Sequence, residues 1–289
     1  MDTAENLKPV IDNSSGSLLR AEALTVKRGN ATLLDGVSVN VEPGELVGVI
    51  GPNGAGKSTL LSILAGLEQP RQGEVVLDGL AINQFDDKER AQRIGWLEQF
   101  AAAHWPVSVE HLVALGRLPF MSGWNRLTDR DHQIVTQAML ATDCHTLAQQ
   151  RVDTLSGGEL TRVMLARVLA SEPALILADE PVAALDISHQ LQTMQLLREF
   201  SSAPKACVVV LHDLTFANHY CDRLYLLDGG RCVAAGTPQE VLTEDNMRNV
   251  YGVELSGAHV DGLMGSSASG NCNPQGVTAL APVFRPVKK

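Results

Sequence analysis

Residues 51–59 read GPNGAGKST and match the pattern G-x-x-x-x-G-K-[ST]. The motif follows the apolar stretch ELVGVI, residues 45–50, which has the composition of a buried strand, and it precedes STLLSILAGL, residues 58–67, which has the pattern of a helix. A strand, a glycine-rich loop and a helix in this order are the context that gives the motif its meaning. With glycine at about 7% of residues, a chance match in such a chain is on the order of 1%. We therefore interpret residues 51–59 as a phosphate-binding loop rather than a glycine-rich turn.

The side chains of this loop have separate predicted roles. Its glycines would let consecutive backbone N–H groups turn inward around the phosphates of a nucleotide, where a Cβ would obstruct them. Lys57 would reach the β and γ phosphates, and the Ser58 hydroxyl would bind Mg²⁺. The predicted nucleotide-binding residues of the loop are Gly51, Pro52, Asn53, Gly54, Ala55, Gly56, Lys57, Ser58 and Thr59.

Three further apolar stretches end in polar residues. ALILADEP brings Asp179 and Glu180, ACVVVLHD brings His212, and RIGWLEQ brings Gln99. Ligands of open parallel sheets bind at the carboxyl ends of the strands. An aspartate at this place typically holds Mg²⁺, and a neighbouring carboxylate can orient and polarise the attacking water. We predict Asp179, Ser58 and Gln99 as metal contacts, and Glu180, His212 and Gln99 as catalytic residues.

The pattern along the chain predicts an α/β fold. From about residue 45, short apolar strands alternate with helical patterns, which indicates a parallel sheet covered by helices. Residues 18–45 have the alternation and turn residues of antiparallel β structure, and residues 100–152 read as helices without strands. We expect one domain at 18–255, a disordered tail at 1–17, and a partly flexible extension at 256–289.

Composition excludes several other classes of protein. The net charge of −10 over 289 residues argues against nucleic-acid binding through a basic field. No apolar run approaches the roughly 20 residues of a membrane helix, and the polar start lacks the apolar core of a secretory signal. We therefore expect a cytoplasmic protein. Scattered cysteines without a C-x-x-C pair predict reduced thiols, at Cys144, Cys207, Cys221, Cys232 and Cys272.

Two adjacent glycines open the helical stretch ELTRVMLARVLA, within LSGGE at residues 155–159. Ser156 and Glu159 fit an S-x-x-E capping box, but a capping box needs no glycines. Gly157 and Gly158 would leave backbone N–H groups exposed at a helix N-terminus, which favours an anion such as a γ-phosphate. The sequence thus predicts a second phosphate contact, made by Ser156, Gly157, Gly158 and Glu159.

Six features follow one another along the chain, namely GPNGAGKST, Gln99, LSGGE, LILADEP, ALD and His212. Their order and approximate spacing resemble those of the ATPase subunits of ATP-binding cassette (ABC) transporters. The resemblance covers residues 18–255. The resemblance implies a P-loop NTPase (RecA-like) core that uses ATP and Mg²⁺. It implies that LSGGE binds the ATP held by a second copy in a head-to-tail dimer. It further implies integral membrane permease subunits as partners, an indirect link to a substrate-binding protein, and a place on the cytoplasmic face of the cell membrane.

This chain departs from the family pattern at several places. The last residue of the LSGGE signature is usually glutamine rather than Glu159, whose effect should be small if it caps its own helix. Arg28 stands where an aromatic residue usually stacks on adenine, and a guanidinium can also stack on a base. Asp186, the last residue of ALD, agrees with the family pattern. The other departures are Val182 and Ala183, where Thr and Ser are common, and Glu98, where proline is common before Gln99.

The element G-R-x-P at Gly116, Arg117 and Pro119 resembles the importer branch for iron–siderophore complexes, haem and cobalamin. A helix end with Gly as stop and Pro beyond it explains these residues equally well. Histidines in the same region lack a close ligand cluster and are expected to face solvent, namely His104, His111, His132 and His145.

Two other classes of protein are open alternatives, besides an ABC transporter of another substrate. A soluble ABC-type ATPase of DNA repair or ribosomes would need a coiled-coil insertion or a second cassette. A P-loop kinase would not need LSGGE.

Overall fold

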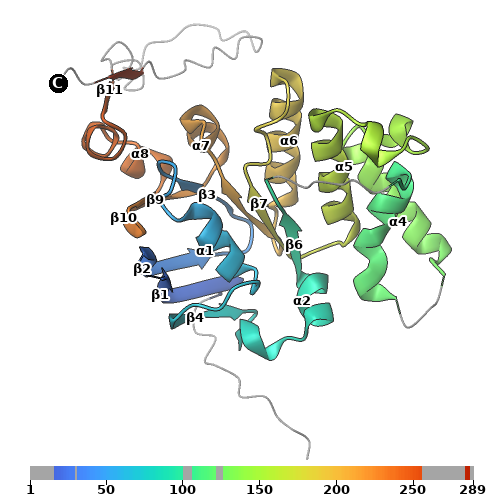
Figure 1. The fold of residues 1–289 in the computed structure, drawn as a ribbon, viewed down its shortest axis with the longest axis horizontal. Helices are drawn as coiled ribbons and strands as arrows, with labels where there is room; N and C mark the ends of the chain where they lie inside the picture. The colour runs from blue at the N-terminus through green and yellow to red at the C-terminus, as the bar shows by residue number, and fades with distance from the viewer. Residues whose placement is uncertain (1–15, 30, 100–105, 122–125, 256–283, 287–289) are drawn as a thin grey trace, which may run out of the picture.

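The computed structural model describes residues 16–29, 31–99, 106–121, 126–255 and 284–286 (Figure 1). The predicted tails at 1–17 and 256–289 lie almost entirely outside these residues, as does His104. Within the described residues, no helix is long and apolar enough to cross a membrane.

A six-stranded sheet in the order β10-β9-β3-β8-β7-β6 forms the centre of the molecule. Neighbouring strands from β9 to β6 run parallel, and β10 pairs with β9 antiparallel. All five residues of β3, β7 and β8 are buried, which explains why these stretches read as continuous apolar runs. The prediction of a parallel sheet is confirmed. The strands are β3 (Leu46–Ile50), β6 (Ile94–Leu97), β7 (Leu175–Asp179), β8 (Ala206–Val210), β9 (Arg223–Asp228) and β10 (Arg231–Gly236).

Alternate residues of these strands enter two different cores. In β8, Val208 and Val210 join the core shared with α1 (Lys57–Leu64), whereas Cys207 and Val209 join the core shared with α6 (Ile187–Phe200) and α7 (Leu214–Tyr220). Because side chains of a strand point alternately to the two faces, the sheet is packed on both sides. This double burial fixes the carboxyl ends of neighbouring parallel strands at the same edge of the sheet.

An antiparallel sheet covers the α1 side of the molecule, as residues 18–45 predicted. Its order is β2-β1-β4-β5, and it packs into the same core as α1. Figure 1 shows β1, β2 and β4 below α1. Its strands are β1 (Leu19–Arg28), β2 (Ala31–Val41), β4 (Gln72–Leu77) and β5 (Leu80–Ala81).

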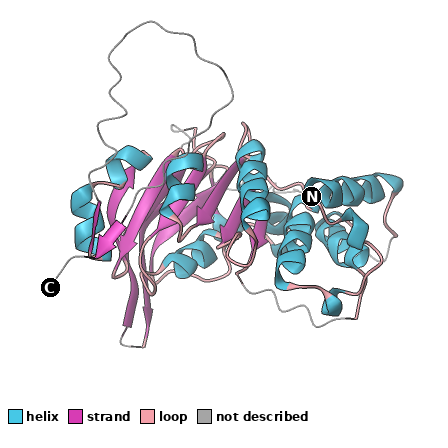
Figure 2. Ribbon diagram, turned by 90° about the horizontal axis from the view of Figure 1, so that it is seen from above, coloured by secondary structure: helices cyan, strands magenta, loops and turns pink. Residues whose placement is uncertain are grey.

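Helices gather at the other end of the molecule (Figure 2). In the described part of residues 100–152 there is no strand, only an isolated bridge between Ser108 and Arg151, so the helical expectation for this stretch agrees with the structure. Helix α5 packs against both α3 and α4 and also against β6. It therefore joins the helical part to the sheet. The helices are α3 (Val109–Ala114), α4 (Asp129–Ala141) and α5 (Gly157–Ala170), with 3₁₀ turns at Leu115–Phe120, His145–Leu147 and Val152–Thr154.

Short elements complete the described chain. A 3₁₀ turn at Ile82–Gln84 and helix α2 (Asp87–Arg93) lead into β6, and the chain after β10 forms helices before two short paired strands. These later elements are α8 (Pro238–Val241), α9 (Glu244–Asn246), a π-helical turn at Met247–Tyr251, β11 (Val253–Leu255) and β12 (Phe284–Pro286).

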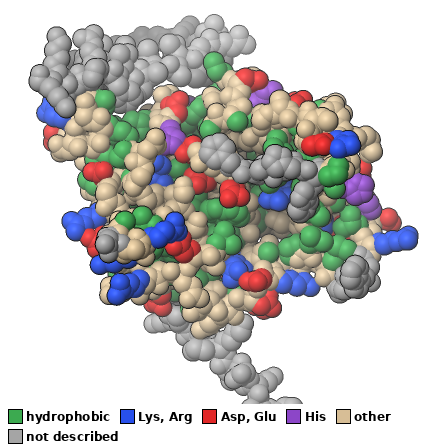
Figure 3. Space-filling model, viewed as in Figure 1, with side chains coloured by type: hydrophobic (Ala, Val, Ile, Leu, Met, Phe, Trp, Pro, Cys, Tyr) green, Lys and Arg blue, Asp and Glu red, His purple; other side chains and the backbone are tan. Residues whose placement is uncertain are grey.

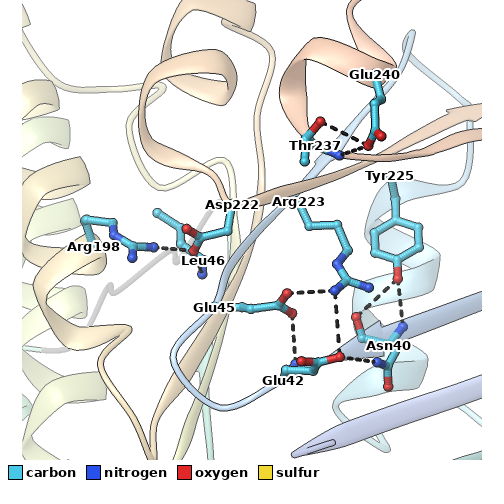
Figure 4. A network of polar contacts seen from close by, with 10 residues as sticks. All are labelled: Asn40, Glu42, Glu45, Leu46, Arg198, Asp222, Arg223, Tyr225, Thr237 and Glu240. Atoms are coloured by element: carbon cyan, nitrogen blue, oxygen red, sulfur yellow. Dashed lines mark hydrogen bonds and ion pairs between the residues drawn. The ribbon is translucent and has the colours of Figure 1, made fainter.

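A polar network fastens the amino ends of β3 and β9, opposite the predicted ligand edge (Figure 4). Asp222 accepts a hydrogen bond from the backbone N–H of Leu46 at 2.8 Å, and Arg223 forms an ion pair with Glu45 at 2.8 Å. The Tyr225 hydroxyl donates to a backbone carbonyl of β2 at 3.1 Å. Polar side chains at this end thus tie the two sheets together.

Candidate nucleotide site

The predicted phosphate-binding loop connects β3 directly to α1, as its sequence context indicated. Gly51, Gly54 and Gly56 have φ angles of 147°, 80° and 99°, in the region that favours glycine. A Cβ on Gly51 would lie 2.1 Å from the carbonyl oxygen of Leu227, and one on Gly56 would lie 2.6 Å from that of Leu33. Two of the glycines are therefore needed by the packing of the chain itself, whereas around Gly54 only the backbone conformation requires glycine.

Lys57 begins α1 and is 6% exposed. Its ammonium donates to the carbonyl oxygens of Gly51 and Pro52, at 2.8 and 2.9 Å. Burial lowers the pKa of Lys57, and the nearby carboxylates of Glu180 and Asp179 oppose that shift. The cation is thus enclosed by the loop and faces the acidic residues at the end of β7, which suits a group that neutralises phosphate charge.

Asp179 is the last residue of β7 and is 5% exposed. Its carboxylate forms a hydrogen bond with Ser58, yet its Oδ1 atom is buried with no hydrogen-bond partner in the part of the chain that the structure describes. Burial raises the pKa of Asp179, the neighbouring Glu180 adds to this, and Ser58 and Lys57 oppose it. A buried unsatisfied carboxylate oxygen beside a hydroxyl is a donor set that Mg²⁺ prefers, so the residues present fit the metal.

Glu180 lies between the two other predicted polar residues. Gln99, which follows β6, donates a hydrogen bond to its Oε2 atom, and the Nε2 atom of His212, which follows β8, forms one with its Oε1 atom. Strands β6 and β8 flank β7 in the sheet, so three neighbouring strand ends converge on one carboxylate. Glu180 has a φ of 51°, a conformation that costs a non-glycine residue about 1 kcal/mol or more and that is often found at functional sites.

The LSGGE segment begins α5. Ser156 is the N-cap, and both halves of the capping box with Glu159 are present: the carboxylate accepts from the Ser156 N–H at 2.8 Å, and the Glu159 N–H donates to the Ser156 hydroxyl at 3.3 Å. These hydrogen bonds lower the pKa of Glu159. The carboxylate therefore folds back onto its own helix, the arrangement in which its effect on a nucleotide should be small.

The two glycines of this segment are not forced by strong packing. A Cβ on Gly157 would meet its nearest neighbour at 3.9 Å, an ordinary contact, and one on Gly158 would lie 3.3 Å from the Ala184 carbonyl oxygen. Neither residue has a positive φ. Packing within the chain thus gives no reason for glycine at Gly157 and a moderate one at Gly158, in contrast to the severe clashes at Gly51 and Gly56.

A cavity of about 480 Å³ lies between the end of β7 and the start of α5. It is lined by Gln99 and Glu180, by Gly157 and Thr161 of α5, and by Ala183. The remaining lining residues are Leu97, Glu98, Leu160, Met164, Pro181 and Ala184.

Two other predicted contacts lie at the surface. Asp186 is the N-cap of α6 and accepts hydrogen bonds from the backbone and side chain of His189, which lower its pKa. Arg28 ends β1 with its side chain 72% exposed and forms an ion pair with Glu68 at 3.3 Å. The contact with His189 was not predicted, although an aspartate followed by histidine three residues later at a helix start could have indicated it.

Helix α3 ends at Ala114, just before the G-R-x-P element, as the helix-end explanation expected, but the chain continues as a 3₁₀ turn. Gly116 and Arg117 lie inside a 3₁₀ turn that continues from α3, and Gly116 has no positive φ. A Cβ on Gly116 would lie 2.3 Å from the Arg167 carbonyl oxygen, so glycine permits the turn to lie against α5. Arg117 is 4% exposed and forms ion pairs with Asp131 and Glu172 at 2.9 and 3.0 Å. Both residues therefore fasten the helical part.

The described histidines of the helical part do not form a metal site. His111, His132 and His145 are exposed, as expected, and no group of three or more His, Cys, Asp or Glu side chains that could hold a metal ion occurs in the described ranges. On the face shown in Figure 3, acidic and basic side chains are interspersed.

Comparison with known proteins identifies the family. The family model described as ABC transporter matches residues 34–183. The chain is 45% identical over 243 residues to the hemin import ATP-binding protein HmuV of Pseudomonas fluorescens, covering 82% of this chain and 94% of that protein. It is 43% identical to the ferric enterobactin transport ATP-binding protein FepC of Escherichia coli, covering 81% and 87%.

A solved structure adds to this comparison. The dimeric structure of the ATP-binding cassette MJ0796, in a post-hydrolysis state bound to ADP and Pi, matches with a TM-score of 0.68 and 30% identity, covering 76% of this chain and 98% of that one. The α/β fold and the ATPase class predicted from the sequence are thus confirmed. The chain belongs to the ABC transporter family, as one of its ATP-binding subunits, and is an ATPase.

Proposed function

We propose that this chain hydrolyses ATP to drive import of an iron-containing chelate, haem or a ferric siderophore complex. The observation that carries the proposal is the convergence of Gln99 and His212 on Glu180, beside the Lys57 ammonium and the unsatisfied oxygen of Asp179. This arrangement places a proton acceptor next to a phosphate-binding loop. The names of the relatives supply the cargo class.

The residues have distinct roles in the proposed reaction. Lys57 and the backbone N–H groups of residues 51–59 would hold the β and γ phosphates. Glu180 would orient the attacking water and draw its proton away, while Gln99 and His212 fix the carboxylate and contact the γ-phosphate. Asp179 and Ser58, with Gln99, would hold Mg²⁺, which neutralises charge on the phosphates when bound. Arg28 would lie over the adenine.

A second copy of the chain would complete each site. Gly157 and Gly158 are the first residues of α5, where backbone N–H groups have no acceptor within the helix, and Gly157 lines the cavity together with Glu180. Asp186 is the N-cap of α6. A helix N-terminus attracts an anion, and the chain's own packing makes little demand for these glycines. We infer that this surface meets the nucleotide bound by a head-to-tail partner. The dimeric form of MJ0796 supports this inference.

The cargo is proposed from the relatives alone. One imports hemin by its name and the other transports ferric enterobactin, so their shared cargo is a chelate that holds iron. The ATPase domain, which we place at residues 18–255, would bind permease subunits at the cytoplasmic face of the membrane and act indirectly with a substrate-binding protein. It would not touch the cargo itself.

The test reconstitutes the chain with the permease that co-purifies with it. ATPase activity should rise when the substrate-binding protein of that system is loaded with haem or with a ferric siderophore, and labelled cargo should accumulate in the vesicles. Vesicles carrying the Glu180→Gln variant are the control for ATP-driven uptake. Stimulation by a cargo without iron, or co-purification with a permease that exports its substrate, would contradict the proposal.

A further inference from the structure

His189 holds both carboxylate oxygens of Asp186. The Oδ1 atom accepts from the backbone N–H of His189 at 2.9 Å, and the Oδ2 atom lies 2.9 Å from Nδ1 of the same residue. The Asp186 side chain is 67% exposed, whereas that of His189 is 26% exposed. An exposed carboxylate is thus fixed in one direction by a largely covered imidazole.

The other edge of the imidazole faces the helical part of the molecule. Its Nε2 atom lies 3.9 Å from the carboxylate of Asp143, which follows α4 and has a φ of 49°. Arg162 of α5 donates to the Asp143 carbonyl oxygen and lies 3.3 Å from its carboxylate. His189 and Arg162 also line the same small gap between α5 and α6. The histidine therefore lies at the contact between the two helices.

The charged groups continue toward the start of α5. Arg162 follows Glu159 by three residues, close to one helical turn, so the two side chains share a face of the helix. The Ser156 hydrogen bonds lower the pKa of Glu159, and the positive charge of Arg162 adds to this effect. The chain of charged groups thus runs from Asp186 through His189, Asp143 and Arg162 to Glu159. It joins the first turns of the two helices whose ends carry the proposed contacts to the partner's nucleotide.

We propose that His189 is a positioning residue that aims Asp186 and, through Asp143 and Arg162, fixes the start of α6 relative to the start of α5. The two helix ends then meet the second copy as one surface. This rests on the proposed shared site. A surface that must contact its partner at two points loses affinity when either point is free to move, because ordering it then costs conformational entropy.

The test measures the ATP-dependent dimer in a Glu180→Gln background, by sedimentation at several protein concentrations. His189→Ala should weaken dimerisation about tenfold or more, the effect expected for loss of a hydrogen bond to a charged group. ATP affinity of the monomer should be unchanged, because Lys57 and Ser58 are not touched. His132→Ala, at an exposed histidine of α4, is the matched control and should dimerise like its parent.

Two more variants separate positioning from a general loss of stability. His189→Asn places an amide near the position of Nδ1, so it should restore contact with Asp186 but not reach Asp143, and dimerisation should be intermediate. In a double-mutant cycle, His189→Ala and Asp143→Ala should be non-additive, the double variant being little worse than His189→Ala alone. Thermal unfolding of each variant shows whether folding is affected. Even when His189→Ala is unstable, the Asn variant and the double-mutant cycle test the positioning role.

The outcomes distinguish this proposal from the one it rests on. If the parent stays monomeric with ATP, the shared site is wrong and the role of His189 falls with it. If the parent dimerises and His189→Ala dimerises equally well, only the positioning role is overturned. Additive effects of His189→Ala and Asp143→Ala would overturn the link to α5.

Discussion

Glu180 is the residue on which the proposed chemistry depends most directly. Replacing it with glutamine keeps the size of the side chain and the strained backbone but removes the proton acceptor. Loss of a general base typically lowers turnover by about 10²–10⁴-fold, so Glu180→Gln should still bind ATP and hydrolyse it at least a hundredfold more slowly. Steady-state phosphate release measures this. Glu199→Gln, at an exposed residue near the C-terminal end of α6, is the control. Turnover near the parental rate would remove Glu180 from the proposed role.

Asp179 illustrates a cost in stability at the same site. Burial holds its folded-state pKa above the unfolded value, so the folded chain binds the proton more tightly. The free energy of unfolding therefore falls as the pH rises from the unfolded pKa of 3.8 through the raised folded value, and it stays lower above that value. Without nucleotide or Mg²⁺, Asp179→Asn should melt at a higher temperature than the parent at pH 7, with the gain shrinking toward acid pH. Hydrolysis should be lost. A lower melting temperature at pH 7 would contradict this account of Asp179.

The sequence predicted which residues carry polar groups at the site better than it predicted which residues contact them. The end of β7 and the loop at 51–59 could be interpreted because a buried strand and a motif fix where polar groups emerge. The contact between His189 and Asp186 was missed, since one histidine on a helix has many structural explanations. The clash of a Cβ at Gly51 with Leu227 was also not predictable, because it joins strands far apart in the sequence.

Elements with a strong local pattern lie where they were expected. The strand at 46–50 and the helix at 157–170 each follow from an apolar run or a helix-forming stretch with a capping box. The continuation of α3 into a 3₁₀ turn at 115–120 is different, because it depends on contact with α5. Tertiary packing, rather than local propensity, decides how that segment ends.

That turn supports a prediction about one methyl group. In Gly116→Ala the new Cβ would lie 2.3 Å from the Arg167 carbonyl oxygen, so the turn must move away from α5. Overpacking of this kind typically costs about 1–3 kcal/mol, and the thermal midpoint should fall by several degrees. Gly54→Ala serves as the comparison, because no atom of a neighbour lies within 4 Å of its Cβ and its cost comes only from backbone strain. Equal stability of Gly116→Ala and the parent would show that the turn adapts freely.

At the scale of the whole molecule, the two halves of the proposed site belong to different parts of the chain. The loop at 51–59 lies on the α1 side of the sheet, whereas Gly157 and Gly158 begin a helix of the helical part, across the cavity from Glu180. A nucleotide held at Lys57 would then be completed by the helical part of a second copy. The sequence indicated this arrangement only through family resemblance, since one chain carries no direct signal of its partner.

Gly158→Asp tests this arrangement, since it places a carboxylate where the partner's γ-phosphate is proposed to lie. The two like charges would repel each other at close range, so the partner's nucleotide should not bind against this helix start. The variant's own loop is untouched, so it should bind ATP as a monomer yet fail to dimerise or hydrolyse ATP.

Lys57→Ala should lose hydrolysis because its loop no longer holds the phosphates. Gly157→Ala, whose Cβ would make only a 3.9 Å contact within the chain, is the mild comparison.

Mixing Gly158→Asp with Lys57→Ala separates a shared site from two independent ones. A head-to-tail pair of one copy each has one site that carries both lesions and one site, built from an intact loop and an intact LSGGE, that carries neither. Partial ATPase activity should therefore appear in the mixture, although each variant alone is inactive, provided that one intact site can turn over. If Gly158→Asp alone hydrolyses ATP close to the parental rate, the start of α5 does not contact the phosphate, and the glycines of LSGGE need another explanation.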